Sequence, residues 1–329
     1  MSHVLQPLVI GLGRSGAGLH LKALRKLARS PGFRIGPVIG CDPAPDTGRD
    51  LSGVVLTTSA AEALHRVADP ASVVAHVCTP PQDRLPLLRE LSDHGVRRML
   101  IEKPLATSHA ELDALRELRE RAGLRIAVVT HWLASELTAR LARSVSDGRY
   151  GPLLAITVEQ HKPRFTKSLT TSAHHSALEV EIPHALALVV RLAGPARLLR
   201  SHCADLRVGR ELRSGLGGAE LTLHHDNGVR TAIRSDLTAP VRRRSVVLEF
   251  RDVEVTAHFP VGEDDDHAQL VLPGGERQIF RDDAILALFR TAYGPVTDGS
   301  PAMDFTVAAE AARLLCEARA AGSTERVTA

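Results

Sequence analysis

The sequence predicts an α/β protein: a doubly wound parallel sheet at the N-terminus, followed by an α+β domain with a large open, mostly antiparallel sheet. Two observations support this prediction. Over the first 130 residues, short apolar runs alternate with helix-like segments, which is typical of a parallel sheet covered on both faces. Beyond that point, long segments of alternating polarity dominate, and these are typical of antiparallel strands.

The N-terminal region contains five predicted strands, each a short and nearly continuous apolar run. These strands are expected at residues 8–11, 35–41, 73–78, 98–102 and 125–130. Helical periodicity is expected at residues 19–27, 85–91 and 111–122. Strands that alternate with helices in this way predict one domain over residues 1–130.

The remaining chain predicts fewer helices and longer strands. Helices are expected at residues 136–145, 177–193 and 309–320, and strand segments at 153–160, 197–208, 218–225, 229–237 and 245–258. We expect residues 131–329 to form a second domain that binds the substrate. Because an apolar sheet face left open marks an interface, we also expect a homodimer or homotetramer joined through this sheet.

Composition excludes several classes of protein. Lys and Arg number 41 against 38 Asp and Glu, so the net charge of +3 gives no field that would favour nucleic acid. The sequence has neither a signal-peptide pattern nor an apolar run of membrane-spanning length, so we expect a cytoplasmic protein with no membrane partner. Its four cysteines lack metal-ligand spacing, and we expect no metal.

A glycine-rich motif joins the first predicted strand to the first predicted helix. Gly11-Leu12-Gly13-Arg14-Ser15-Gly16 has the G-x-G-x-x-G spacing in the strand–turn–helix context that dinucleotide binding requires. The first glycine permits a tight turn, the second lets the backbone approach a pyrophosphate, and the third lets helix and strand pack closely. The sequence therefore predicts a Rossmann domain whose first helix presents its N-terminus to the phosphates.

Asp42 ends the second predicted strand, 26 residues after Gly16. An acid at this place accepts hydrogen bonds from the adenine ribose, and its charge repels a 2′-phosphate. We therefore expect NAD, with NADP as the alternative because Arg14 and Arg49 are available to a 2′-phosphate. An aspartate before Pro43 is also typical of a turn.

Two further segments follow successive predicted strands. They are Val-Cys-Thr-Pro-Pro at residues 77–81 and Ile-Glu-Lys-Pro-Leu at residues 101–105. The carboxyl ends of strands are where doubly wound sheets bind ligands. Together with the glycine motif extended to His20, these segments resemble the glucose–fructose oxidoreductase / inositol dehydrogenase (Gfo/Idh/MocA) family. The resemblance covers nearly the whole chain.

The resemblance implies that Lys103 reaches both the nicotinamide and the substrate, and that Thr79, Pro80 and Glu102 contact the cofactor. An ammonium near the reacting oxygen can stabilise charge or donate a hydrogen bond. The resemblance also implies an unusual peptide bond before Pro104, of the cis form that proline permits. Without the resemblance, Lys103 would be interpreted as an exposed loop lysine.

The family's second motif is an aspartate four residues before a histidine, and His184 matches that histidine. Its ordinary pKa, near 6.5, suits a general base or acid at neutral pH. Here the aspartate position is Val180, which departs from the family pattern. Glu181 or Glu179 is expected to replace the acid, with Glu181 favoured because it lies nearer. Pro183 fits a first helical turn, which would place Glu181 just ahead of the helix.

Other polar residues are predicted to line the substrate pocket or to pack in the core. His131 and Trp132 follow the fifth strand, His161 and Lys162 follow the first strand of the second domain, and His175 precedes the histidine motif. Arg84 is expected to reach a cofactor phosphate or an acidic substrate, or to cap a surface helix.

These features predict an NAD(P)-dependent dehydrogenase or reductase that acts on a small polar alcohol or ketone, such as a sugar, a cyclitol or a derivative. Two alternatives remain open: an imine reductase, and a non-catalytic NAD-binding regulatory protein, which Val180 favours. The sequence leaves open the substrate, its stereochemistry and the direction of the reaction, because pocket shape decides them.

Overall fold

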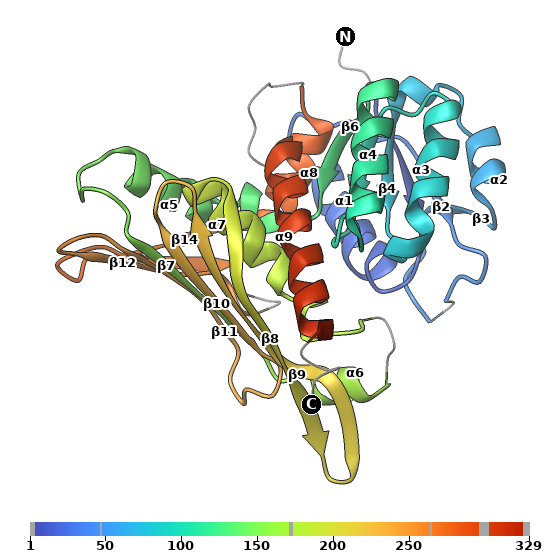
Figure 1. Ribbon diagram of the computed structural model, residues 1–329. Helices are drawn as coiled ribbons and strands as arrows, with labels where there is room; N and C mark the ends of the chain where they lie inside the picture. Colours follow the sequence, from blue (N-terminus) through green and yellow to red (C-terminus); the bar gives the residue numbers. More distant parts are fainter. Residues whose placement is uncertain (1–3, 47, 171–173, 263–264, 296–302, 325–329) are drawn as a thin grey trace. The chain divides into compact units, whose positions relative to one another are not determined.

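A computed structural model of the protein describes residues 4–46, 48–170, 174–262, 265–295 and 303–324. The chain divides into two compact units. The first comprises Met1–His131 and Ile285–Ala308, and the second comprises Trp132–Ala284 and Ala309–Ala329. Each unit is built around one sheet (Figure 1).

The first unit contains a six-stranded sheet in which all paired strands are parallel. The strands are β1 (Gln6–Ile10), β2 (Val38–Cys41), β3 (Val54–Thr57), β4 (Val73–Val77), β5 (Arg98–Ile101) and β6 (Arg125–Val128). Their order, β3-β2-β1-β4-β5-β6, is that of the dinucleotide-binding doubly wound fold. The prediction of a Rossmann sheet is confirmed, and the order reverses at β1 and β4, where such folds bind ligands.

Helices cover both faces of this sheet (Figure 1). They are α1 (Leu21–Ala28), α2 (Ala60–His65), α3 (Arg84–Asp93), α4 (His109–Ala122) and α8 (Ala284–Tyr293), with the short turns η1 (Gly16–His20), η2 (Pro70–Ser72), η3 (Pro81–Asp83) and η4 (His131–Ala134). Local sequence sets their ends. At α4, the Ser108 side chain accepts from the Glu111 amide while the Glu111 carboxylate accepts from the Thr107 amide, so the first turn is capped reciprocally.

Strand β3 and helix α2 were not predicted from the sequence. Strand β3 has four residues at the edge of the sheet, and Val55 and Leu56 are 39% and 44% exposed. A strand with such a short and exposed run does not show the continuous burial that marks the central strands.

The predicted division into residues 1–130 and 131–329 omits one segment. Residues Ile285–Ala308 group with the first unit, although they follow the second unit in sequence. Helix α8 explains this grouping, because Phe289 is fully buried and the Tyr293 hydroxyl lies 2.7 Å from Nε2 of His76 in β4. A single boundary in the sequence cannot describe a unit that is made of two separate segments of the chain.

The second unit contains an eight-stranded sheet in the order β14-β13-β12-β11-β7-β10-β9-β8. Its strands are β7 (Ala155–His161), β8 (Ala196–Val208), β9 (Glu211–His225), β10 (Arg230–Asp236), β11 (Arg243–Glu249), β12 (Glu254–His258), β13 (His267–Val271) and β14 (Arg277–Arg281). All neighbours are antiparallel except β7 and β10. The predicted open, mostly antiparallel sheet is confirmed. The single segment expected at 245–258 is instead the hairpin β11–β12.

One face of this sheet carries the helices of the second unit, and the other carries none among the described residues (Figure 1). These helices are α5 (Glu136–Ser146), α6 (Phe165–Thr170), η5 (Ala177–Glu179), α7 (Ile182–Ala193) and the later part of α9 (Phe305–Thr324). Strand β7 alternates accordingly: Ile156 and Val158 are fully buried and their neighbours half-exposed. Helix α7 is buried at every position except Arg191, so it forms the centre of this core.

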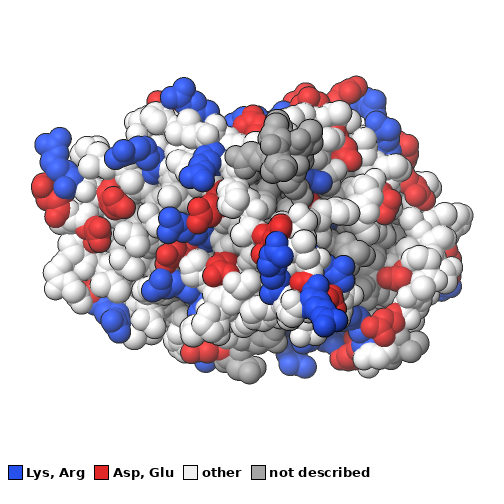
Figure 2. Space-filling view, turned by 60° about the horizontal axis from the view of Figure 1, so that its bottom comes forward, with Lys and Arg blue, Asp and Glu red and all other residues white. Residues whose placement is uncertain are grey.

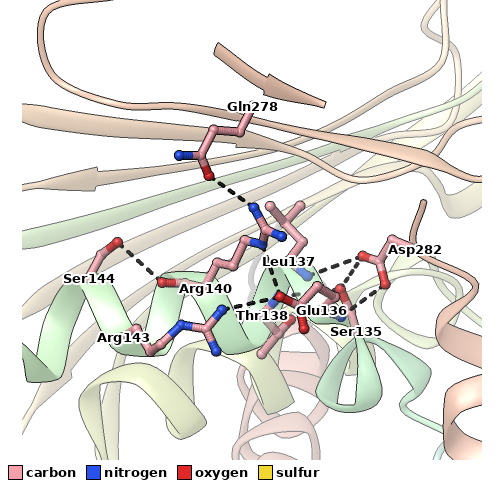
Figure 3. A network of polar contacts seen from close by, with 9 residues as sticks. All are labelled: Ser135, Glu136, Leu137, Thr138, Arg140, Arg143, Ser144, Gln278 and Asp282. Carbon is pink, nitrogen blue, oxygen red and sulfur yellow. Dashed lines mark hydrogen bonds and ion pairs between the residues drawn. The ribbon is translucent and has the colours of Figure 1, made fainter. Parts of the chain in front are cut away.

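The edge of the sheet is tied to α5 by one buried carboxylate. Asp282 follows β14 and accepts hydrogen bonds from the Ser135 hydroxyl and from the Glu136 and Leu137 amides, at 2.9 and 3.3 Å for the two amides (Figure 3). A carboxylate at a helix N-terminus satisfies amides that the helix leaves unpaired and opposes its dipole. Asp282 therefore caps α5 from a position far along the chain.

Basic and acidic side chains lie interspersed over the face of the molecule shown in Figure 2, in keeping with the small net charge. Within the described part of the chain, each helix is too short or too polar to cross a lipid bilayer.

Candidate cofactor site and active site

The glycine loop has the close contacts that its three glycines predict. A Cβ on Gly16 would lie 1.9 Å from the Gly11 carbonyl oxygen, and a Cβ on Gly11 would lie 3.0 Å from the Cys78 backbone. Gly11 also has a φ of +89°, which favours glycine. Only glycine therefore allows β1, the end of β4 and the first helical turn to approach this closely.

Gly13 differs from the other two glycines, because a Cβ there would have no atom of the described residues within 4 Å. Gly13 and Arg14 are exposed, and Ser15 begins the π-helical turn η1 without using its side chain as a cap. Packing does not explain the glycine at position 13, whereas close approach of a ligand phosphate does. This loop and the helix that follows it fit a pyrophosphate at a helix N-terminus.

Asp42 stands at the end of β2, half-exposed, and is bonded to the glycine loop. Its Oδ2 accepts from the Leu12 amide at 2.7 Å, and its Oδ1 accepts from the Ala44 amide at 2.9 Å. A carboxylate oxygen has two lone pairs, so each oxygen keeps an acceptor site for a ribose hydroxyl. The turn role and the ribose role are therefore compatible. Arg49, the alternative partner for a 2′-phosphate, lies 3.1 Å from Asp46.

Thr79 follows β4 directly beside the glycine loop, since a Cβ on Gly11 would lie 3.2 Å from the Thr79 amide nitrogen. The Thr79 hydroxyl oxygen is buried and has no hydrogen-bond partner among the described residues. A buried hydroxyl without a partner costs free energy, and a bound cofactor group would satisfy it. Thr79 thus fits its predicted cofactor role, while Pro80 is exposed beside it.

The loop after β5 carries the half-buried Lys103 and is held by a buried arginine. The peptide bond between Lys103 and Pro104 is cis, as the resemblance implied. Arg84 donates to the carbonyl oxygens of Glu102 and Pro104 on either side of Lys103, and to that of Thr79 at 3.0 Å. Burial lowers the pKa of Arg84 to about 10.

The structure therefore corrects the sequence-based interpretation of Arg84. The residue is 3% exposed, and its guanidinium is committed to three backbone carbonyls. It neither caps a surface helix nor extends towards a ligand. Because these carbonyls belong to the ends of β4 and β5, Arg84 fixes the two loops that carry Thr79 and Lys103.

The Glu102 side chain enters a buried polar chain that the sequence analysis missed. Its Oε1 lies 3.1 Å from Nε2 of His20, whose Nδ1 lies 2.8 Å from Nδ1 of His76, and His76 reaches the hydroxyl of Tyr293. Burial alone would raise the pKa of Glu102, but His20, Lys103 and Arg84 outweigh it and lower that pKa. The polar His76 within the apolar strand Val73–Val77 was a signal, whereas Tyr293 gave none.

In the second unit, Glu181 lies in a small cluster of charged and polar groups. It is the N-cap of α7 and Pro183 occupies the first turn, so the predicted geometry of this helix start is confirmed. Its carboxylate forms an ion pair with Lys162 and lies 3.5 Å from Gln160 Nε2 and 4.0 Å from Arg244 Nη2. The structure therefore brings together two predicted site residues, Glu181 and Lys162.

His184 lies in the first turn of α7 and is 7% exposed. Its ring centroid is 6.1 Å from that of Trp132, which stacks on Phe259 at 4.0 Å. Trp132 is therefore buried beside His184, as the core interpretation expects. Its place in a substrate pocket stays a prediction.

Glu179, the competing acid, has a different set of partners. One oxygen accepts from the His175 amide at 3.0 Å and lies 3.9 Å from the His174 ring. The other oxygen lies 3.3 Å from Arg319 of α9. His175 is exposed, and its contact with Glu179 is through the backbone.

The two remaining predicted substrate residues lie at the ends of regular elements. His161 ends β7, where its Nδ1 accepts from the Asp236 amide at 3.2 Å and its Nε2 lies 3.9 Å from Glu159. His131 is half-buried in the turn η4. Whether either side chain contacts a substrate stays a prediction.

Among the described residues, one group has the composition of a metal site: Asp265, Asp266 and His267 at the start of β13. His267 is hydrogen-bonded to Asp265, 2.8 Å away, and the group contains none of the predicted site residues. It gives no reason to include a metal in the chemistry, and the absence of a metal stays a prediction.

The sheet order, the glycine loop and the strand-end residues define a dinucleotide-binding doubly wound domain. Residues 5–130 match the model of the family GFO_IDH_MocA, described as an oxidoreductase family with an NAD-binding Rossmann fold. This match confirms the resemblance over the N-terminal domain, and with it NAD as the cofactor. A comparison with curated proteins gives no match.

Solved structures of similar fold cover nearly the whole chain at low identity. A protein from Klebsiella pneumoniae described as an NAD binding oxidoreductase is 16% identical, with a TM-score of 0.76 and coverage of 98% of both chains. UDP-N-acetylglucosamine 3-dehydrogenase GnnA from Acidithiobacillus ferrooxidans is 16% identical, with a TM-score of 0.73 over 97% of this chain and 98% of that one. The WlbA dehydrogenase from Chromobacterium violaceum, solved with NADH and UDP-GlcNAcA, is 16% identical, with a TM-score of 0.73 over 98% and 94%.

Proposed function

We propose that this protein is an NAD(P)-dependent dehydrogenase or reductase that acts on the CH–OH or carbonyl group of a small polar molecule, such as a sugar, a cyclitol or a derivative. The main support is the arrangement at one edge of the parallel sheet. Three features follow adjacent strands there. They are a glycine loop that a phosphate can approach closely, the buried Thr79 hydroxyl, which has no hydrogen-bond partner in the described part of the chain, and Lys103, whose neighbouring carbonyl oxygens accept from Arg84.

The cofactor would be held by the loop residues Gly11, Gly13, Arg14, Ser15 and Gly16, by Asp42, and by the strand-end residues Thr79, Pro80, Glu102 and Lys103. A bound nicotinamide supplies or accepts the hydride. Lys103 would donate a hydrogen bond to the reacting oxygen and stabilise its charge. His184 would take the hydroxyl proton in oxidation and return it in reduction.

The second unit supports a polar substrate. Glu181 and Lys162 form a largely buried ion pair three residues from His184, and Trp132 lies against the same histidine. Such a pair can exchange partners with substrate hydroxyls, because an ammonium donates, and a carboxylate accepts, several hydrogen bonds. His131, His161, His175 and Glu179 complete the proposed substrate-binding set. GnnA and WlbA, by their descriptions, use nucleotide sugars, which supports a sugar derivative as the first class to test.

The test is a screen of polyols, sugars and UDP-sugars with NAD and NADP, followed by Lys103→Ala. We expect Lys103→Ala to lower the hydride-transfer rate at least about 10²-fold, with the NADH dissociation constant within a few-fold of the original value. Lys22→Ala, on an exposed position of α1, is the matched control. Near-normal turnover of Lys103→Ala would contradict the proposed role.

His184→Asn provides a second arm of this test. Removal of the general base should lower kcat by about 10²–10⁴-fold while cofactor affinity is retained. A large preference for NADP in steady-state kinetics would overturn the role given to Asp42.

A second candidate function is a non-catalytic NAD-binding regulatory protein. Its support is the buried Val180 at the position of the family's aspartate, together with the pairing of Glu181 with Lys162. Saturable NADH binding without hydride transfer to any alcohol, ketone or imine in the screen would favour this function. Turnover of imines alone would favour an imine reductase.

We also propose a homodimer or homotetramer joined through the helix-free face of the eight-stranded sheet. Small or uncharged side chains occupy its central positions, among them Thr157, Ala232 and Val247, and they are only half-exposed. A monomeric mass by light scattering at micromolar concentration would refute this assembly.

A further inference from the structure

A buried chain is formed by Glu102, His20, His76 and Tyr293, and of these only Glu102 has a role in the proposed function. Both histidines are 0% exposed, and Glu102 and Tyr293 are 6% and 7% exposed. The four side chains come from four elements of the first unit: the end of β5, η1, β4 and α8. Buried titratable groups that contact one another directly need an explanation, because each would be costly if left unsatisfied.

Burial and the neighbouring His20 lower the pKa of His76, so His76 is uncharged. Counting donors and acceptors then leaves two arrangements of protons. An ionised Glu102 only accepts, so Nε2 of His20 must carry a hydrogen. The contact between the two Nδ1 atoms needs one donor and one acceptor. Either His20 carries both hydrogens and donates to His76, or His76 donates to a neutral His20. The two arrangements differ by one proton, and both keep the bond between His76 and Tyr293.

The surroundings favour the arrangement in which His20 is the doubly protonated ring. Burial opposes a charge on His20, but Cys78 and Glu102 outweigh burial and raise its pKa. Burial and the neighbouring charge lower the pKa of His76.

The other groups around the chain agree with this arrangement. Lys103 and Arg84 lower the pKa of Glu102 further and so keep it ionised. Burial raises the pKa of Tyr293, which keeps its hydroxyl neutral. Phe289 of α8 packs against both imidazoles, with ring centroids 5.4 and 5.2 Å away, and contributes no charge.

We propose that His20 and His76 form a buried imidazolium–imidazole bridge that holds the Glu102 carboxylate and thereby positions the loop carrying Lys103. The bridge also connects the two ends of the cofactor site. His20 is the last residue of the turn that starts at the glycine loop, and Glu102 is the residue before Lys103. The helix that faces the phosphates and the loop that faces the nicotinamide are thus fixed to each other by one charged contact.

His20 and His76 are positioning residues on this account, because they act through Glu102. The catalytic value of the bridge rests on the proposed function of Lys103. The existence of the bridge does not, since it depends only on contacts inside the first unit.

The decisive measurement is nuclear magnetic resonance of the full chain with ¹⁵N-labelled histidines and no ligand. A nitrogen–nitrogen coupling across the hydrogen bond between the two Nδ1 atoms identifies this pair among the 16 histidines without any substitution. We expect one ring of the pair to stay protonated at both nitrogens from about pH 6 to 9, whereas an ordinary histidine, with a pKa near 6.5, titrates in that range. Two neutral rings across this range, or no coupling, would overturn the bridge.

Glu102→Gln separates a charged bridge from a merely structural contact. The amide still accepts a hydrogen bond but carries no charge, so we expect the pKa of His20 to fall, although Cys78 still raises it. Glu117→Gln, at an exposed position of α4, is the control and should leave both rings unchanged. A His20 pKa that is the same in Glu102→Gln as in the original protein would contradict the role of the carboxylate. If Glu102→Gln does not fold, the spectrum of the unsubstituted protein still shows whether the bridge exists.

Tyr293→Phe tests the far end of the chain with little change in packing. The His76 signals should shift while His20 stays protonated. Once a substrate is known, we expect kcat to fall several-fold with KM within about twofold, because misplacement of a catalytic group affects the chemical step.

The bridge and the proposed function can fail separately. If the protein shows the bridge signals but no turnover of any substrate, only the proposed function is contradicted. A protein with turnover but without these signals would fail only this inference.

Discussion

The two sheets of the molecule differ in where their polar side chains lie. In the parallel sheet, β4 is buried at all five positions, and its one polar residue, His76, must find partners inside the domain. In the eight-stranded sheet, buried and half-exposed positions alternate along β7, β10 and β12, so charged residues face outwards. In a sheet covered on both faces, polar side chains lie at the strand ends or form hydrogen bonds with one another in the interior. In a sheet with one open face, polar side chains can also lie on that face.

The same contrast applies to two of the buried carboxylates of the proposed site, Glu102 and Glu181. Glu102 is held by His20 within a closed chain that ends at Tyr293. Glu181 lies with Lys162, Gln160 and Arg244, which surround it from the adjacent strands β7 and β11. The first arrangement suits a fixed cofactor loop, and the second suits exchange with substrate hydroxyls.

The largest effect is expected in the glycine loop of the parallel unit. Gly16→Ala would force its new Cβ to within 1.9 Å of the Gly11 carbonyl oxygen, so the backbone must move. We expect a loss of about 3 kcal/mol or more in the free energy of unfolding, at the upper end of overpacking effects. Chemical denaturation with circular dichroism measures it.

Gly13→Ala is the matched comparison, because its Cβ would meet no atom within 4 Å. This variant should keep its stability within about 0.5 kcal/mol but bind NADH more weakly, since the methyl group occupies the path of the pyrophosphate. If Gly13→Ala lowered the free energy of unfolding as much as Gly16→Ala, packing and not cofactor binding would explain the glycine at position 13.

An intermediate effect is expected from the pH dependence of the histidine chain. The pKa of His20 is raised in the folded protein, so the stability it contributes is complete below its unfolded pKa near 6.5 and is lost as pH rises towards the folded value of about 10. The pKa of His76 is lowered, so its contribution falls as pH drops below about 6.5. Stability attributable to the pair should therefore peak near neutral pH.

The measurement is the free energy of unfolding from pH 5 to 10 for the original protein and for His20→Gln. Their difference should shrink by on the order of 2 kcal/mol between neutral pH and pH 10, because each pKa unit corresponds to ~1.4 kcal/mol before coupling and desolvation reduce it. A constant difference over this range would mean that His20 is neutral in the folded state.

The smallest effect on folding is expected on the open face of the eight-stranded sheet. Val247→Lys should change the free energy of unfolding of one chain by less than about 0.5 kcal/mol, since the side chain can reach solvent. It should nevertheless dissociate the proposed oligomer by placing a charge in its interface. Light scattering before and after the substitution checks this outcome, with Lys22→Glu in the first unit as the control. An unchanged oligomer would place the interface elsewhere.

Much of the fold was predictable because its information is local. Apolar runs gave β1, β4, β5 and β6, and the alternating segments gave β8 and β10. Strand β3 was missed because it is a short exposed edge, and the hairpin β11–β12 was taken as one segment because the turn near Asp252 interrupts the alternation only briefly. The glycine loop was predictable because the spacing of its glycines is itself the structural requirement.

The candidate site was predictable only in part. Sequence motifs identified Lys103, Thr79 and His184. The sequence did not identify the residues that pair with the buried charged side chains. Arg84 was expected to reach a phosphate or an acidic substrate, or to cap a helix, whereas it donates to three backbone carbonyls. The pairing of Lys162 with Glu181 was not predicted. No local pattern relates His76 to Tyr293, which follows it by 217 residues.

The sequence by itself determined the order of strands and helices, the place of the phosphate loop and the residue types available for chemistry, because backbone conformation and periodic burial are set by near neighbours along the chain. Tertiary structure alone decided which charges face each other. Partners such as Glu102 with His20, or Asp282 with the start of α5, are separated by 82 and 146 residues. Ion pairing and desolvation depend on distance in space, and only the folded chain fixes that distance.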